Sequence, residues 1–429
     1  MQTNLDSHAK ALPDAEEAES ILRSCVHCGF CNATCPTYQL LGNELDGPRG
    51  RIYLIKQLLE GEPVSAKTQL HLDRCLSCRN CETTCPSGVT YHRLLDIGRA
   101  ELERRVARPV GERLTRTGLR AVIPRPAVFD ALLKTGRAVR PLLPASVQAK
   151  IPARAATPAR ARPAPRHARR VLMLEGCVQP SLSPNTNAAA ARVLDRLGIS
   201  VMPVSEAGCC GATDYHLNAQ QDGLDRARRN IDAWWPAVEA GAEAIVQTAS
   251  GCGAFVKEYG HLLRNDRRYS AKAARVSALA RDLVEVLAAG PLDKLQPADG
   301  ASAARIAFHC PCTLQHAQKL GGAVESVLTR LGFDLSAVPD SHLCCGSAGT
   351  YSITQPELAQ KLRDNKLTAL ESGQPDVIAT ANIGCQMHLD GAGRTRVRHW
   401  IELVDEALDG SNASLQPAQT SATPVPAQA

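Results

Sequence analysis

The stretch that decides the fold at the start of this chain is residues 25–36, CVHCGFCNATCP. The same spacing returns in residues 75–86, CLSCRNCETTCP. In both stretches the cysteines are separated by two, two and three residues, and a proline follows the fourth cysteine. Thiolates at this spacing are ligands of [4Fe–4S] cubanes, and the proline turns the chain away because it cannot continue a helix. The chain is therefore expected to carry electrons.

In proteins with two such runs, the fourth cysteine of each run ligates the other cluster. We therefore expect one cubane on Cys25, Cys28, Cys31 and Cys85, and a second on Cys75, Cys78, Cys81 and Cys35. Zinc is disfavoured because its sites take four ligands, usually from separated C-x2-C pairs. A disulfide framework is disfavoured because residues 1–20 are polar and acidic and contain no apolar secretion segment.

The spacer between the two runs has the pattern of helices. Apolar residues recur at helical spacing over residues 51–60, and residues 66–73 form a second expected helix that leads into Cys75. The first helix is expected to start within residues 47–51, GPRGR. The arginines of this segment could tune a cluster potential or face solvent, and we favour solvent. Residues 1–110 are therefore expected to form an α-helical ferredoxin-like domain.

Length and composition place the chain among multidomain proteins. It has 429 residues, 17 cysteines and a formal net charge of +6, and aromatic residues make up only 3 %. Two or three domains with aliphatic and alanine-rich cores are expected. No apolar run approaches the roughly 18 residues that a membrane span requires. We expect a cytoplasmic protein that could also lie on the inner face of the inner membrane.

The positive charge is concentrated between residues 113 and 170, where 12 arginines and 2 lysines face one acidic residue, Asp130. Residues 111–169 are expected to form a basic Pro/Ala/Arg-rich linker, whose stretch 151–166 is expected to be semi-rigid and extended. Residues 128–139 have the pattern of an amphipathic helix that could contact an anionic membrane, although a solvated linker or a partner contact remains open. No nucleic-acid motif accompanies these charges. The tail, residues 410–429, is expected to be disordered.

After the linker the chain repeats itself. Cys177, Cys209 and Cys252 correspond to Cys312, Cys344 and Cys385, at separations of 135, 135 and 133 residues. This regularity indicates a gene duplication, with copies at 170–300 and 301–409. The remaining cysteine, Cys310, aligns with Glu175 and is not expected to be a ligand.

Each copy has the pattern of an α/β domain, so the whole chain is expected to be an α+β multidomain protein. The expected strands are 171–174, 200–204 and 244–248 in the first copy, and 306–308, 337–338 and 377–380 in the second. Each strand runs toward a cysteine, and ligands bind beyond the carboxyl ends of strands in such sheets. Two quartets are therefore expected to converge, Cys177, Cys209, Cys210 and Cys252 in the first copy, and Cys312, Cys344, Cys345 and Cys385 in the second.

Three roles are open for these quartets. They could hold a further iron–sulfur cluster, with Gly211 or Gly346 allowing close backbone approach, they could exchange with a disulfide, or they could be buried structural thiols. We favour the cluster. The nearby His27, His309 and His316 could tune a potential or relay protons, and we expect them instead to be structural or to lie behind the ligands.

The Cys-Cys-Gly repeats resemble the CCG domain of heterodisulfide reductase. Joined to a helical two-cubane domain, they resemble iron–sulfur subunits of flavin-linked glycolate, lactate and glycerol-3-phosphate dehydrogenases, most closely the bacterial glycolate oxidase iron–sulfur subunit. The segments that carry this resemblance are 25–31 (CVHCGFC), 36–42 (PTYQLLG), 174–177 (LEGC), 309–316 (HCPCTLQH) and 344–351 (CCGSAGTY).

This resemblance implies a function. FAD-containing partner subunits would oxidise glycolate to glyoxylate, and this chain would pass the electrons toward a membrane quinone. No catalytic base and no flavin-binding G-x-G-x-x-G motif is expected in the chain itself. Lactate or glycerol 3-phosphate as donor, and a thiol–disulfide reductase, are the alternatives. The heterodisulfide reductase pattern ends in C-x2-C, whereas GAF follows Cys252 and QMH follows Cys385. Each quartet thus lacks a fifth cysteine, which argues against disulfide chemistry.

Overall fold

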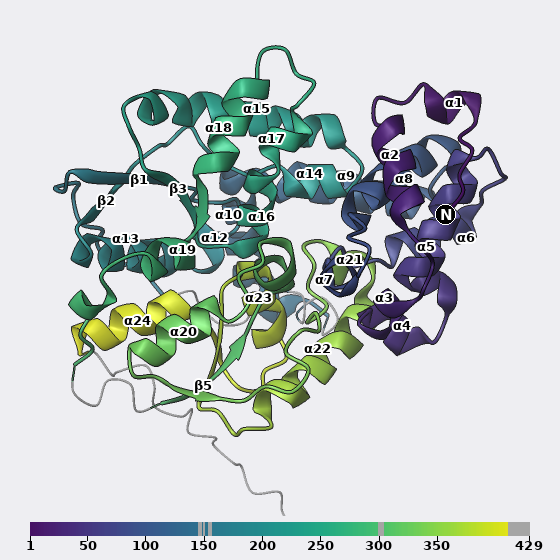
Figure 1. The fold of residues 1–429 in the computed structure, drawn as a ribbon. Coiled ribbons are helices and arrows are strands. Elements are labelled where there is room, and N and C mark those ends of the chain that lie inside the picture. The colour runs from purple at the N-terminus through teal and green to yellow at the C-terminus, as the bar shows by residue number, and fades with distance from the viewer. Residues whose placement is uncertain (145–147, 149–150, 153–156, 299–303, 411–429) are drawn as a thin grey trace, which may run out of the picture.

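The computed structural model describes residues 1–144, 148, 151–152, 157–298 and 304–410. A helical N-terminal unit lies beside two α/β units, so the chain is a mixed α+β multidomain protein, as expected (Figure 1). The expected tail falls almost entirely on 411–429, outside the described residues. Within the described part of the chain, no helix combines the length and apolar character needed to cross a membrane.

The N-terminal unit is built from short helices around the two cysteine loops. Its elements are α1 (Ser7–Lys10), α2 (Ala15–Ser24), α3 (Phe30–Ala33), α4 (Pro36–Leu41), η1 (Glu44–Asp46), α5 (Pro48–Leu59), α6 (Ala66–Asp73), α7 (Asn80–Thr84) and α8 (Tyr91–Arg105). Both expected spacer helices are confirmed, with Pro48 at the start of α5 and a capping box at Ser65 before α6. Leu22, Ile55 and Leu94 are among the residues that form the core between α2, α5 and α8.

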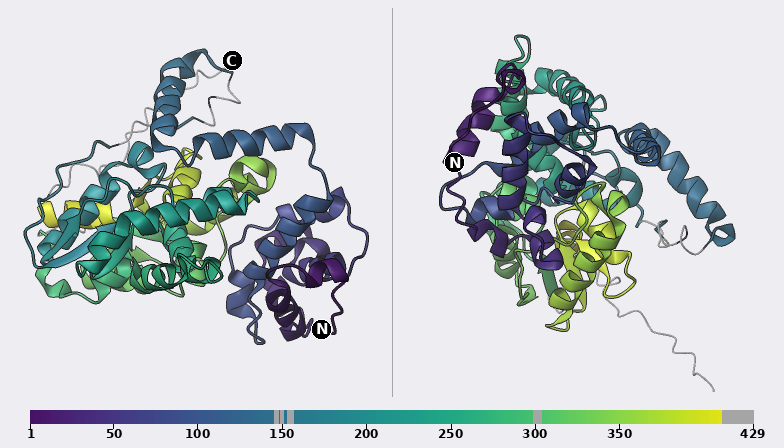
Figure 2. Two further views of the ribbon diagram at one scale, coloured as in Figure 1. Left: turned by 90° about the horizontal axis from the view of Figure 1, so that it is seen from above. Right: turned by 90° about the vertical axis from the view of Figure 1, so that its right-hand side faces the viewer.

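An outer arm follows this unit. It consists of α9 (Val110–Val122), α10 (Pro126–Val139) and the 3-10 turn η2 (Arg140–Leu142), and none of their residues is fully buried. Figure 2 shows these helices, in blue, on the outside of the molecule. The helix expected over 128–139 is confirmed. Helix α9 was not predicted, and apolar residues spaced along one of its sides make it a second amphipathic helix.

The first α/β unit alternates strands with helices. Its elements are β1 (Arg169–Met173), α12 (Gln179–Leu182), α13 (Asn185–Arg196), β2 (Ile199–Met202), α14 (Ala212–His216), α15 (Gln220–Glu239), β3 (Ala244–Gln247), α16 (Ser250–Lys257), α17 (Tyr259–Leu262), α18 (Ser270–Leu279), β4 (Ala280–Asp282), α19 (Leu283–Ala288) and η3 (Leu292–Lys294).

The second α/β unit repeats this order. Its elements are β5 (Arg305–His309), the π-turn η4 (Thr313–Ala317), α20 (Ala323–Arg330), β6 (Asp334–Ser336), α21 (Tyr351–Thr354), α22 (Pro356–Glu371), β7 (Val377–Thr380), α23 (Ile383–Asp390), β8 (Val397–His399) and α24 (Trp400–Asp409). The strand expected at 337–338 was misplaced, because β6 ends at Ser336 and these two residues follow it.

Both sheets are parallel and have the same topology. The strand orders are β2-β1-β3-β4 and β6-β5-β7-β8. In the first sheet β2 pairs with one side of β1, and the chain then crosses over β1 so that β3 pairs with its other side. In the second sheet β6 and β7 flank β5 in the same way. The carboxyl ends of the central strands at such a switch point are where α/β sheets place their ligands. The cysteines follow the carboxyl ends of the central strands β1, β3, β5 and β7 and of the adjacent edge strands β2 and β6.

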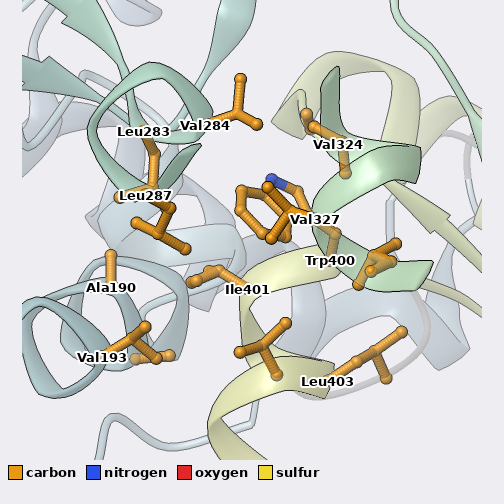
Figure 3. Packing of buried hydrophobic residues seen from close by; sticks show 14 of the residues in the cluster. Ala190, Val193, Leu283, Val284, Leu287, Val324, Val327, Trp400, Ile401 and Leu403 are labelled. Carbon is orange, nitrogen blue, oxygen red and sulfur yellow. The ribbon is translucent and has the colours of Figure 1, made fainter. Parts of the chain in front are cut away.

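The two α/β units share one hydrophobic core. Helix α13 packs on α24, and α19 packs on α20, so each pair joins one helix from each copy. Figure 3 shows Ala190 and Val193 of α13, Leu287 of α19 and Val327 of α20 around Trp400 and its neighbour Ile401. Arg192 of α13 also forms an ion pair with the buried Asp405 of α24, at 2.6 Å. The duplicated units therefore pack as a pseudo-symmetric pair.

Candidate iron–sulfur sites

The two cysteine loops of the N-terminal unit adopt one backbone conformation. His27 and Gly29 flank the second cysteine of the first loop with φ of 60° and 88°, and Ser77 and Arg79 occupy the same places in the second loop with φ of 52° and 60°. Left-handed φ is strained for the three residues that are not glycine. These left-handed residues curl each loop, and the first three cysteines of each loop line one cavity.

Site 1 is defined as Cys25, Cys28, Cys31 and Cys85. These four residues line one cavity, so the fourth cysteine of the second run joins the first three of the first run. Burial, with the neighbouring thiols of Cys25, Cys85 and Cys28, raises the pKa of Cys31 to about 11. Such a pocket disfavours a bare thiolate and favours one that is bound to a cation.

Site 2 is defined as Cys75, Cys78, Cys81 and Cys35. They line a second cavity, and Cys81 lines both cavities, so the two sites are adjacent. Burial and neighbouring thiols raise the pKa values of Cys78 and Cys81 well above normal. The Tyr91 hydroxyl donates to Cys75 Sγ at 3.6 Å. The structure thus brings together the two crossed quartets that the motifs predict.

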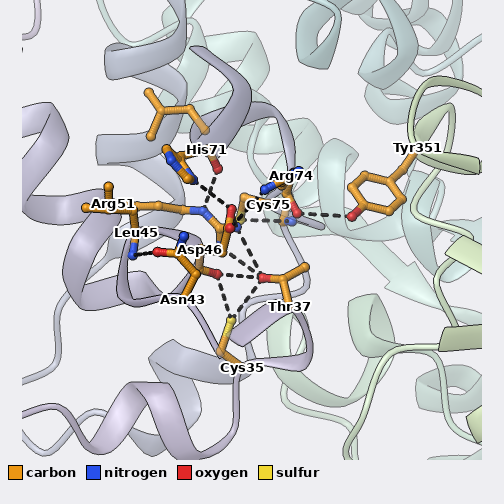
Figure 4. Close-up of polar contacts among 12 residues, drawn as sticks. Cys35, Thr37, Asn43, Leu45, Asp46, Arg51, His71, Arg74, Cys75 and Tyr351 are labelled. Carbon is orange, nitrogen blue, oxygen red and sulfur yellow. Dashed lines mark hydrogen bonds and ion pairs between the residues drawn. The ribbon is translucent and has the colours of Figure 1, made fainter. Parts of the chain in front are cut away.

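A buried cation lies beside site 2 (Figure 4). The Arg51 guanidinium is 1 % exposed, donates to the His71 carbonyl at 2.7 Å and to Thr37 Oγ1 at 3.1 Å, and is 3.6 Å from the Asp46 carboxylate. Thr37 Oγ1 lies 3.3 Å from Cys35 Sγ. Burial alone would lower the pKa of Arg51. The net shift is upward, because the pKa-raising electrostatic effects of Cys75, Tyr91, Cys35 and Asp46 are larger than the effect of burial. The expectation that this arginine faces solvent was wrong.

The first quartet comprises Cys177, Cys209, Cys210 and Cys252. Their thiols interact in series, with Cys209 between Cys177 and Cys210, and Cys210 next to Cys252. The neighbouring thiols lower the pKa of Cys209 and raise that of Cys210. The backbone of the vicinal pair is held by Asn230, which donates to the Cys209 carbonyl at 3.0 Å, and by the Tyr259 hydroxyl, which donates to the Cys210 carbonyl at 2.6 Å.

The second quartet comprises Cys312, Cys344, Cys345 and Cys385. Cys312 Sγ and Cys344 Sγ are 4.0 Å apart, and Cys345 contacts both Cys344 and Cys385. The Gly346 amide and the Asn382 side chain each donate to a thiol of this quartet at 3.4 Å, to Cys344 and Cys385 respectively. Such donors stabilise thiolates, so the group suits ligation.

The glycine of each Cys-Cys-Gly turn is required by a close approach of backbone. A Cβ on Gly211 would lie 2.4 Å from the Gly223 carbonyl of α15, and a Cβ on Gly346 would lie 2.6 Å from the Ala359 carbonyl of α22. Both residues also have left-handed φ, at 101° and 87°. The close approach expected at these glycines is therefore toward a supporting helix.

Site 2 lies against the second quartet. Cys78 and Cys344 belong to one buried cluster, and Cys312 packs against it. Asn80 donates to the His342 carbonyl at 3.2 Å, and the Tyr351 hydroxyl donates to the Arg74 carbonyl at 3.1 Å. The two thiol groups come from segments more than 200 residues apart in the sequence, and the sequence alone does not indicate this contact.

The histidines near the cysteines differ in their surroundings. His316 bonds to Thr83 Oγ1 and to the His342 carbonyl, both at 3.0 Å, which is the structural role expected. His27 lies in the strained loop of site 1, with its ring 6.2 Å from that of Tyr53. His309 is 2 % exposed and lies with Cys345 and Cys385 in a group whose ligand atoms are all within 4.8 Å of one another. Cys310 is buried in the shared hydrophobic core.

The donor set fits iron–sulfur clusters. All 17 cysteines are free, and sixteen of them form four compact thiol groups at the ends of helices and strands. Burial and the neighbouring thiols raise the pKa of most of the cysteines that show a shift. A bound cation would lower these pKa values again, because it stabilises the thiolate form. Thiolates are soft ligands, so four of them close together bind iron–sulfur clusters in preference to hard cations such as magnesium or calcium.

Comparison with known proteins gives the same class. Residues 21–89 match a 4Fe-4S dicluster domain, and residues 171–257 and 306–390 each match the CCG family, described as a cysteine-rich domain. The fold and these matches define an iron–sulfur protein with a two-cluster helical domain and a duplicated CCG domain. It carries 4Fe-4S clusters, and this composition fits electron transfer.

Whole-chain relatives are more specific. The chain is 69% identical over 409 residues to the glycolate oxidase iron-sulfur subunit of Escherichia coli (strain K12). The matched region covers 95% of this chain and 100% of that protein. It is 30% identical to the probable glycolate oxidase iron-sulfur subunit of Bacillus subtilis (strain 168), over 91% and 94% of the two chains. Lactate utilization protein A of Geobacillus thermodenitrificans (strain NG80-2) is 28% identical over 55% of this chain and 98% of that protein. The chain belongs to the family of glycolate oxidase iron–sulfur subunits.

Proposed function

We propose that this chain is the electron-transfer subunit of a glycolate-oxidising complex. Glycolate would be oxidised to glyoxylate on FAD-containing partner subunits, and the chain would carry the electrons toward a membrane quinone. The identity of 69% over the whole length of a glycolate oxidase iron-sulfur subunit supports this donor over lactate, since the lactate utilization protein is 28% identical over about half of the chain.

We propose ligands from the geometry of the thiol groups. One 4Fe-4S cluster is held by Cys25, Cys28, Cys31 and Cys85, and the other by Cys75, Cys78, Cys81 and Cys35. A further cluster is held by one or both quartets of the CCG domains. The proposed units are residues 1–110, the arm and linker 111–169, the CCG domains 170–300 and 301–409, and the tail 410–429.

The observation that carries the proposal is the packing of site 2 against the second quartet. When bound, the clusters supply one-electron carriers, which a two-electron flavin donor requires. The role of the chain itself is to hold the clusters near one another and to exclude water from them. Cys78, Cys344 and Leu76 are buried together, and Cys81 lies in the wall between sites 1 and 2. Sites 1 and 2 and the second quartet therefore form one continuous series through the protein.

The ends of this series differ in exposure. Cys28 is exposed, and its neighbours Val26 and Phe30 are 68 % and 61 % exposed, so site 1 lies at the surface. A flavin subunit that docked there would place its cofactor near the first carrier. We further propose that the arm lies on the inner face of the membrane, because Leu114 and Leu132 are exposed beside basic residues.

Thiol–disulfide exchange receives no support from the geometry. Cys209 and Cys345 are each 1 % exposed, so a disulfide substrate could not reach the vicinal pairs without local opening. Exchange chemistry requires an accessible thiolate.

The proposal is tested by deleting this chain and restoring it as variants. Without the chain, glycolate-dependent reduction of a quinone analogue should be lost while the flavin subunits remain. Cys78→Ala should restore less than a tenth of the activity, because site 2 connects site 1 to the second quartet. Cys310→Ala, a buried cysteine outside the four groups, should restore full activity. Unchanged activity in the deletion strain would refute the proposal.

A further inference from the structure

His309 is the last residue of β5, at the carboxyl edge of the second sheet. Its imidazole is 2 % exposed, and neither Nδ1 nor Nε2 has a hydrogen-bond partner among the described residues. Burial of a polar group without a hydrogen-bond partner is unfavourable, and both ring nitrogens of His309 are buried in this way. The unpartnered ring therefore points to a bound group.

The group that this ring faces is the second quartet. A ring nitrogen of His309 and the sulfurs of Cys345 and Cys385 all lie within 4.8 Å of one another. Cys312 and Cys344 complete the quartet through a 4.0 Å sulfur–sulfur contact. An imidazole nitrogen at this distance from thiolates is in place to bind the same metal centre.

We propose that the His309 imidazole is a fifth ligand, beside four thiolates, of the iron–sulfur cluster in the second quartet. This inference rests on the proposed occupation of that quartet by a cluster. It gives a nitrogen donor to a site that has no fifth cysteine, since Gln386, Met387 and His388 follow Cys385.

Sequence spacing alone would favour His388, which stands three residues after Cys385. The structure favours His309, because His388 Nε2 is already bonded to the Ala359 carbonyl at 3.2 Å. Thr380 stands opposite His309 in the β5–β7 register, and its buried hydroxyl also has no partner among the described residues. Metal-bound histidines commonly donate their second ring N–H to a neighbouring oxygen. No hydrogen bond joins His309 and Thr380 here, so such a bond to Thr380 would require a shift of the ring or the hydroxyl.

The first quartet differs at this position. Leu174 aligns with His309, at the same separation of 135 residues as the cysteines. The two copies therefore offer different donor sets, four thiolates in one and four thiolates with a neutral nitrogen in the other. Replacing thiolate by imidazole raises the potential of an iron–sulfur centre. A cluster with an imidazole at this fifth position should therefore have a higher potential than the same cluster with a fifth thiolate there.

The test is nitrogen hyperfine spectroscopy and Mössbauer spectroscopy on the whole protein, enriched in 57Fe and in 15N-histidine. The wild type should show one histidine nitrogen coupled to a cluster. His309→Leu, which installs the residue of the first copy, should lose this coupling and change the Mössbauer parameters of one cluster. His388→Leu should retain both. Should His309→Leu fail to fold, His309→Cys should keep the iron, lose the nitrogen coupling and lower the potential of that cluster.

The outcomes separate the two proposals. Iron equal to two cubanes only would overturn the cluster of the CCG domains, and the inference with it. Iron beyond two cubanes with a nitrogen coupling that survives in His309→Leu and His309→Cys, or that disappears in His388→Leu, would leave the cluster in place and overturn the role of His309. Zinc bound at His309, in place of iron, would also overturn it.

Discussion

Arg51 shows how one residue can set the chemistry of a site. It is a fully buried cation whose hydrogen bonds reach Thr37 and the His71 carbonyl, and Thr37 in turn contacts Cys35. A positive charge this close to the proposed cluster ligands would stabilise the extra negative charge of the reduced state. At an effective dielectric constant of about 20, a unit charge roughly 6–8 Å from the cluster contributes about 2–3 kcal/mol.

We therefore predict that Arg51→Gln lowers the reduction potential of the cluster at site 2 by on the order of 100 mV. Arg51→Lys keeps the charge and should lower it much less. Redox titration followed by EPR measures both. Because Asp46 loses its partner in Arg51→Gln, the iron content must be shown to be unchanged. Equal potentials in the wild type and Arg51→Gln would contradict the electrostatic role of Arg51.

At the residue scale, spacing in the sequence predicts the thiols but not their surroundings. The two runs indicate the eight cysteines of sites 1 and 2, because the ligand geometry is built into local loops. Arg51 is buried, and the ring nitrogens of His309 have no hydrogen-bond partner, because of packing against segments that are distant in the sequence. No local sequence pattern therefore predicts either feature. Only the alignment of His309 with Leu174 hints at a difference between the copies.

The Cys-Cys-Gly turns give a test at the scale of elements. Gly211→Ala and Gly346→Ala should each destabilise the protein by at least about 3 kcal/mol, because the new Cβ would overlap a helix carbonyl at 2.4 or 2.6 Å. Gly393→Ala is the matched control, with φ of 70° and no atom within 4 Å, and should cost only the left-handed strain of about 1–2 kcal/mol. Thermal unfolding distinguishes them, and equal losses in all three would contradict the packing described.

The cap of α24 gives a second test. Burial lowers the pKa of His399 to about 4, and its neutral ring donates to the Thr248 carbonyl at 2.8 Å and accepts from the Ile401 amide. The unfolded chain binds a proton below about pH 6.5, and the folded chain does not until about pH 4. Stability from this group is thus complete above pH 6.5 and is lost as pH falls toward 4, by up to about 3 kcal/mol.

His399→Asn keeps a capping oxygen and removes the titration. Its melting temperature should therefore fall less than that of the wild type between pH 7 and pH 5.5. Other buried histidines titrate in both proteins, so the difference between the two slopes isolates His399. Parallel slopes would show that His399 does not titrate in this way.

Elements with strong patterns could be predicted, and short ones could not. The helices over 48–59 and 66–73 carry both apolar spacing and start signals, and the structure has both. Strands β4 and β8 have only three residues each, and β6 was misplaced by a few residues, because three residues are too few to show a period. These three segments are strands because each pairs in parallel with a longer neighbouring strand, which the sequence pattern does not show.

At the scale of the whole molecule, the N-terminal unit is held by both CCG units. Glu258 of the first unit pairs with Arg79 at 3.0 Å and lies 3.5 Å from Arg93, while the second unit contacts Asn80 and Arg74. These contacts fix the order of the thiol groups. Duplication could be inferred from the cysteine offsets, whereas the docking of three units depends on surfaces that no repeat or motif marks.

The arm gives a prediction at this scale. If it lies on the membrane, the double variant Leu114→Glu with Leu132→Glu should abolish co-sedimentation of the purified complex with anionic vesicles, since both leucines are more than half exposed. Ile353→Glu, an exposed apolar residue away from the arm, should leave it unchanged. Binding that is insensitive to the double variant would place the membrane contact elsewhere.

The proposed transfer of electrons from glycolate to this chain can be tested by EPR of the anaerobically isolated complex. Spectra are recorded before and after addition of glycolate, with lactate and glycerol 3-phosphate as matched donors and dithionite as the full reductant. We expect that glycolate alone among the three donors produces the signals of reduced [4Fe–4S] clusters. Full reduction by dithionite without any reduction by glycolate would contradict it.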